Sequence, residues 1–203
     1  MNLWDAQYER GDGLRFWPNE DLVRFIGRHY GMVELARPEK VLEIGCGNGA
    51  NLWFLAELGF DVTGLDSSWK ALQLADQRLC DRDLSASLHY GDMREMKYES
   101  DSFDLVADVM AMQHLELEDH LPVYREIIRV LKPGGRVFSY HLAEGSDYQR
   151  IFPTSGPACL IRQQVLRQQL EKAGFTQINM EQTSRTYESG SLLAVYHVVE
   201  AQR

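Results

Sequence analysis

Three glycines follow an apolar segment at a spacing that could hold a nucleotide-like ligand. Residues 41–44 read Val-Leu-Glu-Ile, and Gly45, Gly47 and Gly49 come directly after them. Glycine adopts positive φ angles and lets a ligand approach the backbone without a Cβ in the way. A helix that begins after such a loop presents its first, unpaired N–H groups to the same ligand. The segment therefore predicts a ligand-binding loop between a strand and a helix.

Two ligands compete for this loop. Residues 45–50 satisfy the dinucleotide pattern Gly-x-Gly-x-x-Ala, and Asp66 follows at the distance where an acid would bind a ribose. Glu43, two residues before the first glycine, would repel a pyrophosphate but would favour a cationic ligand. S-Adenosylmethionine carries a sulfonium and an α-ammonium and has no phosphate. Asp92 could accept a hydrogen bond from an adenine amino group, so S-adenosylmethionine is favoured over a nicotinamide dinucleotide.

These side chains need a parallel sheet to bring them together. Apolar segments that predict strands alternate with segments whose apolar residues recur at helical spacing. The expected strands are 41–44, 60–65, 88–90, 103–109, 136–142, 177–187 and 192–201, and the expected helices are 49–58, 69–80, 119–131 and 161–173. This alternation predicts an α/β fold with a doubly wound, mostly parallel seven-stranded sheet, helices on both faces and an antiparallel last strand. Ligands of such sheets bind at the carboxyl ends of the strands, where the strand order reverses.

The chain divides into residues 1–37, an N-terminal helical and aromatic extension, and residues 38–203, the domain expected to bind the cofactor. The first 18 residues look irregular and contain several aromatic side chains. Pro18-Asn19-Glu20 opens a helical stretch whose apolar face extends to Val33, and Pro38 ends it. We expect the aromatic side chains either to close over the ligand as a lid or to pin the extension to the domain.

Six short motifs, in order along the chain, resemble the class I S-adenosylmethionine-dependent methyltransferases. They are Val-Leu-Glu-Ile-Gly-Cys-Gly-Asn-Gly at 41–49, Val-Thr-Gly-Leu-Asp at 62–66, Gly-Asp-Met at 91–93, Phe-Asp-Leu-Val at 103–106, Leu-Lys-Pro-Gly-Gly at 131–135 and Glu-Lys-Ala-Gly-Phe at 171–175. The likeness extends over about residues 38–203. It implies a Rossmann-like fold that binds S-adenosyl-L-methionine and releases S-adenosyl-L-homocysteine.

The resemblance also implies roles for single residues. The glycines would line the methionine part of the cofactor, Asp66 would bind the ribose hydroxyls, and Asp92 with the Met93 backbone would hold the adenine. Asp108 and the turn that leads to His114 would flank the methionine part and face the acceptor. The residues expected to contact the cofactor are Glu43, Gly45, Cys46, Gly47, Gly49, Asp66, Ser67, Asp92, Met93 and Asp108.

Methyl transfer is an in-line displacement from which a neutral thioether leaves, so alignment of the reacting atoms matters most. A general base is needed only when the acceptor must lose a proton. His114, after the fourth expected strand, and His141, at the end of the fifth, are the candidate catalytic residues, although each could instead be a packing residue. No metal site is expected, because Asp104 and Asp108 lie on one strand face without a nearby His or Asn partner.

Segments before the first strand and after the fifth would cover the acceptor. The second of these, about residues 143–160, is short, which favours a small metabolite over a protein as the acceptor. Arg15, Arg150 and Arg162 could bind an anionic acceptor, or each could be a solvated charge. The expected reaction is methyl transfer to an O, N or S nucleophile of a small molecule. The alternatives are a non-catalytic or regulatory S-adenosylmethionine-binding protein and a nicotinamide-dependent oxidoreductase.

Composition narrows the range of partners. The 203 residues include 30 acidic and 21 basic side chains, which gives a net charge of −9 that opposes binding to nucleic acid or to an anionic membrane. No apolar run approaches the roughly 18 to 20 residues of a membrane-spanning helix. Cys46, Cys80 and Cys159 form no Cys-x-x-Cys pair, which fits a reducing compartment. We therefore expect a cytoplasmic monomer or homodimer.

Overall fold

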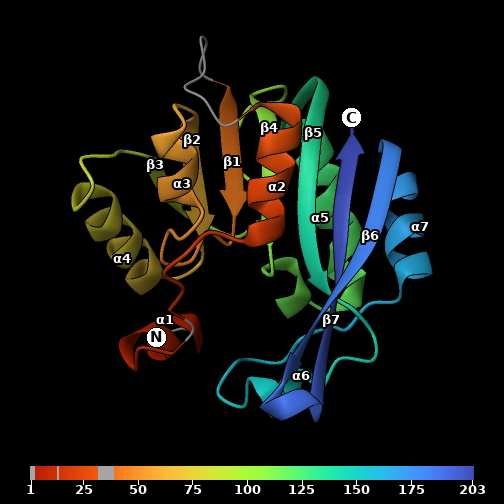
Figure 1. The fold of residues 1–203 in the computed structure, drawn as a ribbon. Coiled ribbons are helices and arrows are strands. Elements are labelled where there is room, and N and C mark those ends of the chain that lie inside the picture. The colour runs from red at the N-terminus through yellow and green to blue at the C-terminus, as the bar shows by residue number, and fades with distance from the viewer. Residues whose placement is uncertain (1–2, 13, 32–38) are drawn as a thin grey trace.

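In the computed structural model, which describes residues 3–12, 14–31 and 39–203, seven strands form one sheet (Figure 1). The strands are β1 (Lys40–Ile44), β2 (Asp61–Asp66), β3 (Ser87–Tyr90), β4 (Phe103–Val109), β5 (Leu131–Leu142), β6 (Thr176–Tyr187) and β7 (Leu192–Gln202). Their order is β3-β2-β1-β4-β5-β7-β6. Strands β1 to β5 pair in parallel, and β7 runs antiparallel to both β5 and β6. The predicted sheet is confirmed, and β7 lies between β5 and β6, so that β6 forms the edge.

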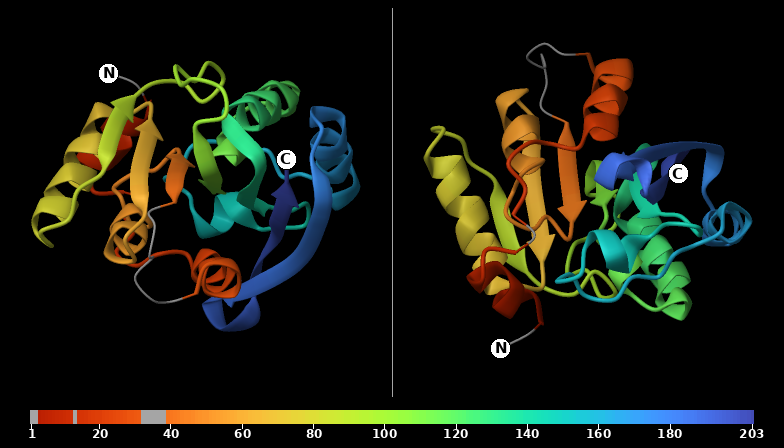
Figure 2. Two further views of the ribbon diagram at one scale, coloured as in Figure 1. Left: turned by 90° about the horizontal axis from the view of Figure 1, so that it is seen from above. Right: turned by 60° about the horizontal axis from the view of Figure 1, so that its bottom comes forward.

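Helices cover both faces of this sheet, as predicted (Figure 2). One face is covered by α2 (Glu20–His29), α3 (Leu52–Glu57) and α4 (Trp69–Cys80), and the other by α5 (Leu117–Val130) and α7 (Gln163–Ala173). Phe25 and Leu55 belong to the first core, together with Phe138 of β5. Ile127 and Leu170 belong to the second. Because the central strands meet apolar cores on both faces, β4 is a nearly continuous apolar run.

Local side-chain bonds explain where two of the helices begin. The Asn19 side chain accepts hydrogen bonds from the backbone N–H groups of Asp21 and Leu22, which starts α2. Ser68 caps α4 in the same way, and its hydroxyl oxygen accepts a bond from the Ala71 N–H at 3.0 Å. The Ser68 cap places the start of α4 at the predicted residue.

Three details differ from the sequence-based expectation. Residues predicted to be irregular include a helix, α1 (Leu3–Glu9). β5 begins at Leu131, directly after α5, so residues 133–135 lie inside the strand rather than before it. A further short helix, α6 (Tyr148–Ile151), lies in the segment after β5. The predictions for Val33 and Pro38 lie outside the described residues.

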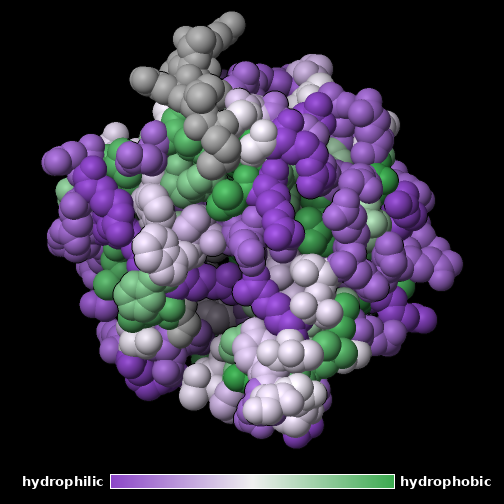
Figure 3. Space-filling view, in the orientation of Figure 1, coloured by the Kyte–Doolittle hydropathy of each residue, from purple (hydrophilic) through white to green (hydrophobic). Residues whose placement is uncertain are grey.

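Hydrophilic side chains predominate on the face of the molecule shown in Figure 3, and apolar residues are scattered among them. Within the described ranges, no helix has both the length and the apolar character needed to cross a membrane.

Candidate functional site

A cavity of about 980 Å³ lies at the carboxyl ends of β1, β2 and β4. This is the edge where the strand order reverses, since β1 lies between β2 and β4. Its size is near the upper end of the roughly 300 to 1,000 Å³ that ligand sites occupy. Residues of α1, the segment 14–20, the loop after β1, the turn after β4 and the β6–β7 hairpin also line it. The cavity therefore draws on segments from both halves of the sequence.

The glycine loop after β1 depends on glycine at each of its three positions, with φ values of +62°, +53° and +74° at Gly45, Gly47 and Gly49. A Cβ at Gly45 would overlap the Cβ of Ala111, and one at Gly47 would lie 2.5 Å from the Tyr8 hydroxyl oxygen. Both glycines line the cavity. Gly49, also expected to contact the cofactor, lies outside the cavity lining.

Gly49 instead permits close packing of the loop against α4. A Cβ at this position would lie 2.9 Å from the Cβ of Ala75. The glycines of this motif thus permit close packing on two sides, with Ala111 and Tyr8 at the cavity and with Ala75 of α4.

Glu43, at the end of β1, is 1% exposed and lines the cavity. The Asn51 side-chain amide donates to Glu43 Oε1 at 2.6 Å. Oε2 has no hydrogen-bond partner among the described residues. Burial raises the pKa of Glu43 to about 8, although the Asn51 hydrogen bond and the nearby Arg15 charge oppose this rise. A cation in the cavity could pair with Oε2 and relieve the cost of burying it.

Asp66, at the end of β2, is fixed by backbone N–H groups. Gly47 N–H donates to Oδ2 and Ser68 N–H to Oδ1, each at 2.8 Å. Burial raises the pKa of Asp66, while hydrogen bonds from Gly47, Ser68 and Ser67 oppose the rise. A carboxylate has about four acceptor positions, so these three bonds leave capacity for a ligand hydroxyl. Asp66, Ser67 and Cys46 all line the cavity.

Asp92, after β3, lines the cavity together with Met93. The Arg94 guanidinium donates to Asp92 Oδ2 at 2.6 Å, and this hydrogen bond is the main cause that holds the pKa of Asp92 below its usual range. Asp92 is therefore an ionised acceptor at neutral pH, already oriented by its neighbour.

Asp108 and His141, expected to contact the cofactor and to act in catalysis, both lie outside the cavity lining. Both side chains are fully buried, and His141 Nε2 lies 3.0 Å from Asp108 Oδ2 and 3.0 Å from the Tyr124 hydroxyl oxygen. Asp108 Oδ1 accepts hydrogen bonds from the N–H groups of Ala111 and Met112. The Asp108 carboxylate thus holds the turn after β4 through these hydrogen bonds, and His141 lies within hydrogen-bond distance of the same carboxylate.

The alternation of β5 explains the placement of His141. Successive side chains of a strand point to opposite faces. Tyr140 lines the cavity, whereas His141 points into the core on the other side.

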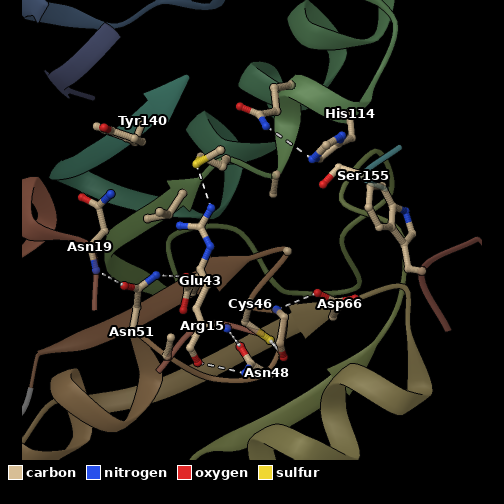
Figure 4. A pocket seen from close by; sticks show the side chains of 18 of the residues that line it. Arg15, Asn19, Glu43, Cys46, Asn48, Asn51, Asp66, His114, Tyr140 and Ser155 are labelled. Atoms are coloured by element: carbon tan, nitrogen blue, oxygen red, sulfur yellow. Dashed lines mark hydrogen bonds between the residues drawn. The ribbon is translucent and has the colours of Figure 1, made fainter. Parts of the chain in front are cut away.

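His114 lies in a short 3-10 turn, η1 (Met112–His114), and lines the cavity. Its Nδ1 lies 2.9 Å from the carbonyl oxygen of Pro157, which can only accept a hydrogen bond, so Nδ1 is the donor and Nε2 carries the lone pair. The Gln113 side-chain nitrogen lies 3.4 Å from Nε2 (Figure 4). Burial lowers the pKa of His114, which keeps the ring neutral and able to accept a proton.

The N-terminal residues form part of the cavity wall. The Trp4 ring packs edge-on against His114 with 4.6 Å between ring centroids. Asp5 Oδ1 accepts bonds from the Ser68 hydroxyl at 2.7 Å and from the Lys70 N–H at 3.1 Å, which ties α1 to the start of α4. Arg15 also lines the cavity, whereas Arg150 and Arg162 do not.

Several lining residues were not predicted from the sequence, among them Asn19, Asn51, Arg185, Tyr187 and Tyr196. The hairpin residues carry no local motif, and only the antiparallel insertion of β7 beside β5 brings them to the site. Among the residues that the structure describes, no group of three or more His, Cys, Asp or Glu side chains could hold a metal ion.

Comparisons with known proteins agree with this geometry. Residues 41–135 match a family model described as a methyltransferase domain. The chain is 32% identical over 144 residues to the 27-O-demethylrifamycin SV methyltransferase of Amycolatopsis mediterranei, covering 66% of this chain and 51% of that protein. It is 33% identical over 138 residues to the cypemycin N-terminal methyltransferase of a Streptomyces species, covering 66% of this chain and 52% of the relative. The chain thus spans about half the length of these curated relatives.

The fold has counterparts among solved structures. Phosphoethanolamine N-methyltransferase 2 of Haemonchus contortus, in complex with S-adenosyl-L-methionine, superposes with a TM-score of 0.75 at 19% identity, covering 99% of this chain and 56% of that one. The family match, the strand order, and the glycine loop with its acids all lead to one assignment. The chain belongs to the class I S-adenosylmethionine-dependent methyltransferases, a family whose methyl donor is S-adenosyl-L-methionine.

Proposed function

We propose that this chain transfers a methyl group from S-adenosylmethionine to a small-molecule acceptor. The observation that carries the proposal is that Glu43, which lines the cavity together with the glycine loop, has a buried oxygen without a hydrogen-bond partner among the described residues. Such an oxygen suits a cationic group and opposes a pyrophosphate. The rifamycin and phosphoethanolamine relatives are named for small-molecule acceptors, which supports the same class here.

The lining residues fit the cofactor. Glu43 would pair with its α-ammonium group, Asp66 would accept from a ribose hydroxyl, and Asp92 would accept from the adenine amino group. Gly45 and Gly47, which line the cavity, would let the methionine part approach the loop backbone. When bound, S-adenosylmethionine supplies a methyl group on a sulfonium, so that a nucleophile bonds to carbon while the electron pair of the C–S bond leaves with a neutral thioether.

His114 is the candidate general base. The hydrogen bond from Nδ1 to Pro157 leaves the lone pair on Nε2, and the lowered pKa keeps the ring neutral. The Gln113 amide nitrogen lies 3.4 Å from Nε2, so an acceptor would replace this long contact. An oxygen or nitrogen acceptor would pass its proton to Nε2 as the bond to the methyl carbon forms. A thiol that is already ionised would need only alignment.

Residues 1–37 would act as an extension that closes the site, and residues 38–203 as the catalytic domain. Trp4 and Tyr8 already lie over the cavity, where they would exclude water from the reacting atoms. We also propose a cytoplasmic monomer or homodimer without nucleic-acid or membrane partners, on the grounds of net charge and cysteine usage.

Titration calorimetry with S-adenosylhomocysteine, with NADH as the comparison ligand, tests the cofactor. We expect S-adenosylhomocysteine to bind and NADH not to bind. Asp66→Ala should weaken binding by roughly 10- to 150-fold, the scale of a hydrogen bond to a charged group. Asp61→Ala is the matched control, since Asp61 is exposed at the opposite end of the same strand. Binding of NADH, or equal affinity in the Asp66 and Asp61 variants, would contradict the assignment.

Methyl transfer is tested by a separate activity assay. Acceptor candidates are incubated with the protein and S-adenosylmethionine, and the S-adenosylhomocysteine formed is measured. For an oxygen or nitrogen acceptor, His114→Ala should lower turnover in a pH-dependent manner and leave cofactor affinity nearly unchanged. Cofactor binding without turnover on any acceptor would favour a regulatory binding protein.

A further inference from the structure

Three arginines line the cavity, and two of them are already paired with acids. Arg94 binds Asp92 and Asp119, and Arg185 of β6 binds Glu20 at 2.9 Å. No salt bridge within the described ranges involves the third, Arg15. Its Nη2 lies 2.8 Å from the Met110 sulfur, a weak acceptor. The cavity thus contains a guanidinium that has no carboxylate partner in the part of the chain that the structure describes.

The Arg15 backbone is anchored while its side chain crosses the cavity. The Asn48 side-chain amide donates to the Arg15 carbonyl at 3.0 Å and accepts from its N–H at 3.4 Å. Figure 4 shows the side chain extending from this anchor toward Met110, away from Asp66 and toward the side where Tyr140 and His114 lie. The guanidinium therefore faces the half of the cavity that the ribose and adenine acids leave open.

The Met110 backbone adopts a conformation that is rare for its residue type. Its φ is +63°, and its N–H donates to the Tyr140 carbonyl at 2.9 Å. Non-glycine residues in this region are strained and gather at ligand sites. The strained turn brings the sulfur of Met110 to Arg15.

Three tyrosines from β5 and the hairpin form a wall on this side. The rings of Tyr140 and Tyr196 stack with 4.7 Å between centroids. Burial is the main cause that raises the pKa of Tyr196, so this phenol stays protonated, and Tyr187 lies beside it. A guanidinium beside protonated phenols offers donors and no anion.

The balance of charges in the cavity also favours an anionic second ligand. The sulfonium and α-ammonium groups of the cofactor would join Arg15 as positive charges in the cavity, whereas the cofactor carboxylate and Glu43, which lies close enough to Arg15 to feel its charge, would supply two negative ones. One positive charge among these groups remains, and an anionic group on the second ligand would offset it. Guanidinium groups bind carboxylates and phosphates through paired N–H donors, whereas a neutral ligand leaves the charge uncompensated.

We propose that the acceptor carries a carboxylate or phosphate group, which Arg15 binds with the hydroxyl group of Tyr187. This proposal rests on the methyl-transfer function proposed above. It narrows the acceptor to a small anionic molecule whose nucleophile faces His114 while its anionic end lies at Arg15.

Simple probes test the anion site without knowledge of the acceptor. Protein saturated with S-adenosylhomocysteine is titrated with benzoate, phenyl phosphate and benzamide, which share a ring and differ in charge. We expect one anion to bind at least about tenfold more tightly than benzamide, the scale of a charge-assisted bond. Whichever of benzoate and phenyl phosphate binds more tightly shows whether the site prefers a carboxylate or a phosphate. Arg15→Gln should abolish the preference, and Tyr187→Phe should reduce it several-fold.

Two controls separate this site from the cofactor site. Arg10→Gln changes an exposed arginine that pairs with Asp12 outside the cavity, and it should bind all probes as the unmodified protein does. Arg15→Gln should bind S-adenosylhomocysteine within about twofold of the unmodified affinity. A loss of about tenfold or more, with binding of 5′-methylthioadenosine unchanged, would assign Arg15 to the carboxylate of the cofactor and overturn the proposal.

The remaining outcomes are also decisive. Equal binding of benzamide and the anions, with S-adenosylhomocysteine bound, overturns the anion site alone. Failure of S-adenosylhomocysteine to bind the unmodified protein overturns the proposed function and, with it, this inference.

Discussion

Glu43 is deeply buried, and one of its oxygens has no hydrogen-bond partner in the described part of the chain, a state that costs free energy unless a ligand or a proton relieves it. The pKa of about 8 means that most molecules hold this carboxyl group protonated at pH 7 when the cavity is free. A bound ammonium group would favour the ionised form and lower the pKa. Ligand binding and proton release should therefore be linked.

This linkage gives a calorimetric prediction. Near pH 7, S-adenosylhomocysteine should release up to about one proton as it binds, because the free protein holds a proton that the complex does not. Titration in buffers of different ionisation enthalpy measures this number. Glu43→Gln should abolish the release, and Glu57→Gln, at the exposed end of α3, should leave it unchanged. Release that persists in Glu43→Gln would locate the proton elsewhere.

The sequence predicted the ends of the strands better than the direction of their side chains. Glu43, Asp66 and Asp92 lie where their motifs place them, each at the end of a short parallel strand. Asp108 and His141 also lie at the predicted strand ends, but their side chains point into the buried interior and do not line the cavity. Because the pleat alternates at every residue, a motif without a clear face cannot distinguish Tyr140 from His141.

At the scale of elements, α1 depends on contacts rather than on its own sequence. Seven residues are too few for a helix that is stable alone. Asp5 lies at the N-terminus of α4, where a negative charge is favoured by the helix dipole and by free N–H groups. Docking therefore holds α1 in place and positions Trp4 against His114.

Removal of the Asp5 carboxylate should release this contact. Losing a helix cap costs about 0.5 to 2 kcal/mol, which in Asp5→Ala should raise hydrogen exchange across residues 3–9. S-Adenosylhomocysteine should partly restore protection if α1 closes over the ligand. Asp12→Ala changes a half-buried acid just beyond the helix and serves as the control. Unchanged exchange in Asp5→Ala would mean that aromatic packing alone holds α1.

The bounds of a helix or strand could be predicted where a single local sequence signal determines them. The Ser68 cap and the apolar run of β4 gave α4 and β4 their observed bounds. α1 was missed because tertiary contacts, rather than propensity, make residues 3–9 helical. The sequence also did not predict that β7 lies between β5 and β6, because strand order depends on long-range pairing that local patterns do not encode.

At the scale of the whole molecule, ligand binding should raise thermal stability. A ligand present at 100 times its dissociation constant adds about 2.7 kcal/mol to the free energy of unfolding. For a chain of this length, each kcal/mol raises Tm by roughly 2 to 4 °C, so S-adenosylhomocysteine should raise Tm by about 5 to 11 °C. Scanning calorimetry measures the shift, and NADH at the same concentration should produce none. An equal rise in Tm with S-adenosylhomocysteine and with NADH would contradict the cofactor assignment.

The cavity wall brings together residues 14–20 and the β6–β7 hairpin, and Arg185 binds Glu20 across that join. During synthesis, β1, β2 and β4 leave the ribosome well before the hairpin. The segments that carry Glu43, Asp66 and Asp92 are therefore synthesised well before those that carry Tyr187 and Tyr196. The cavity wall is complete only when β7 inserts between β5 and β6.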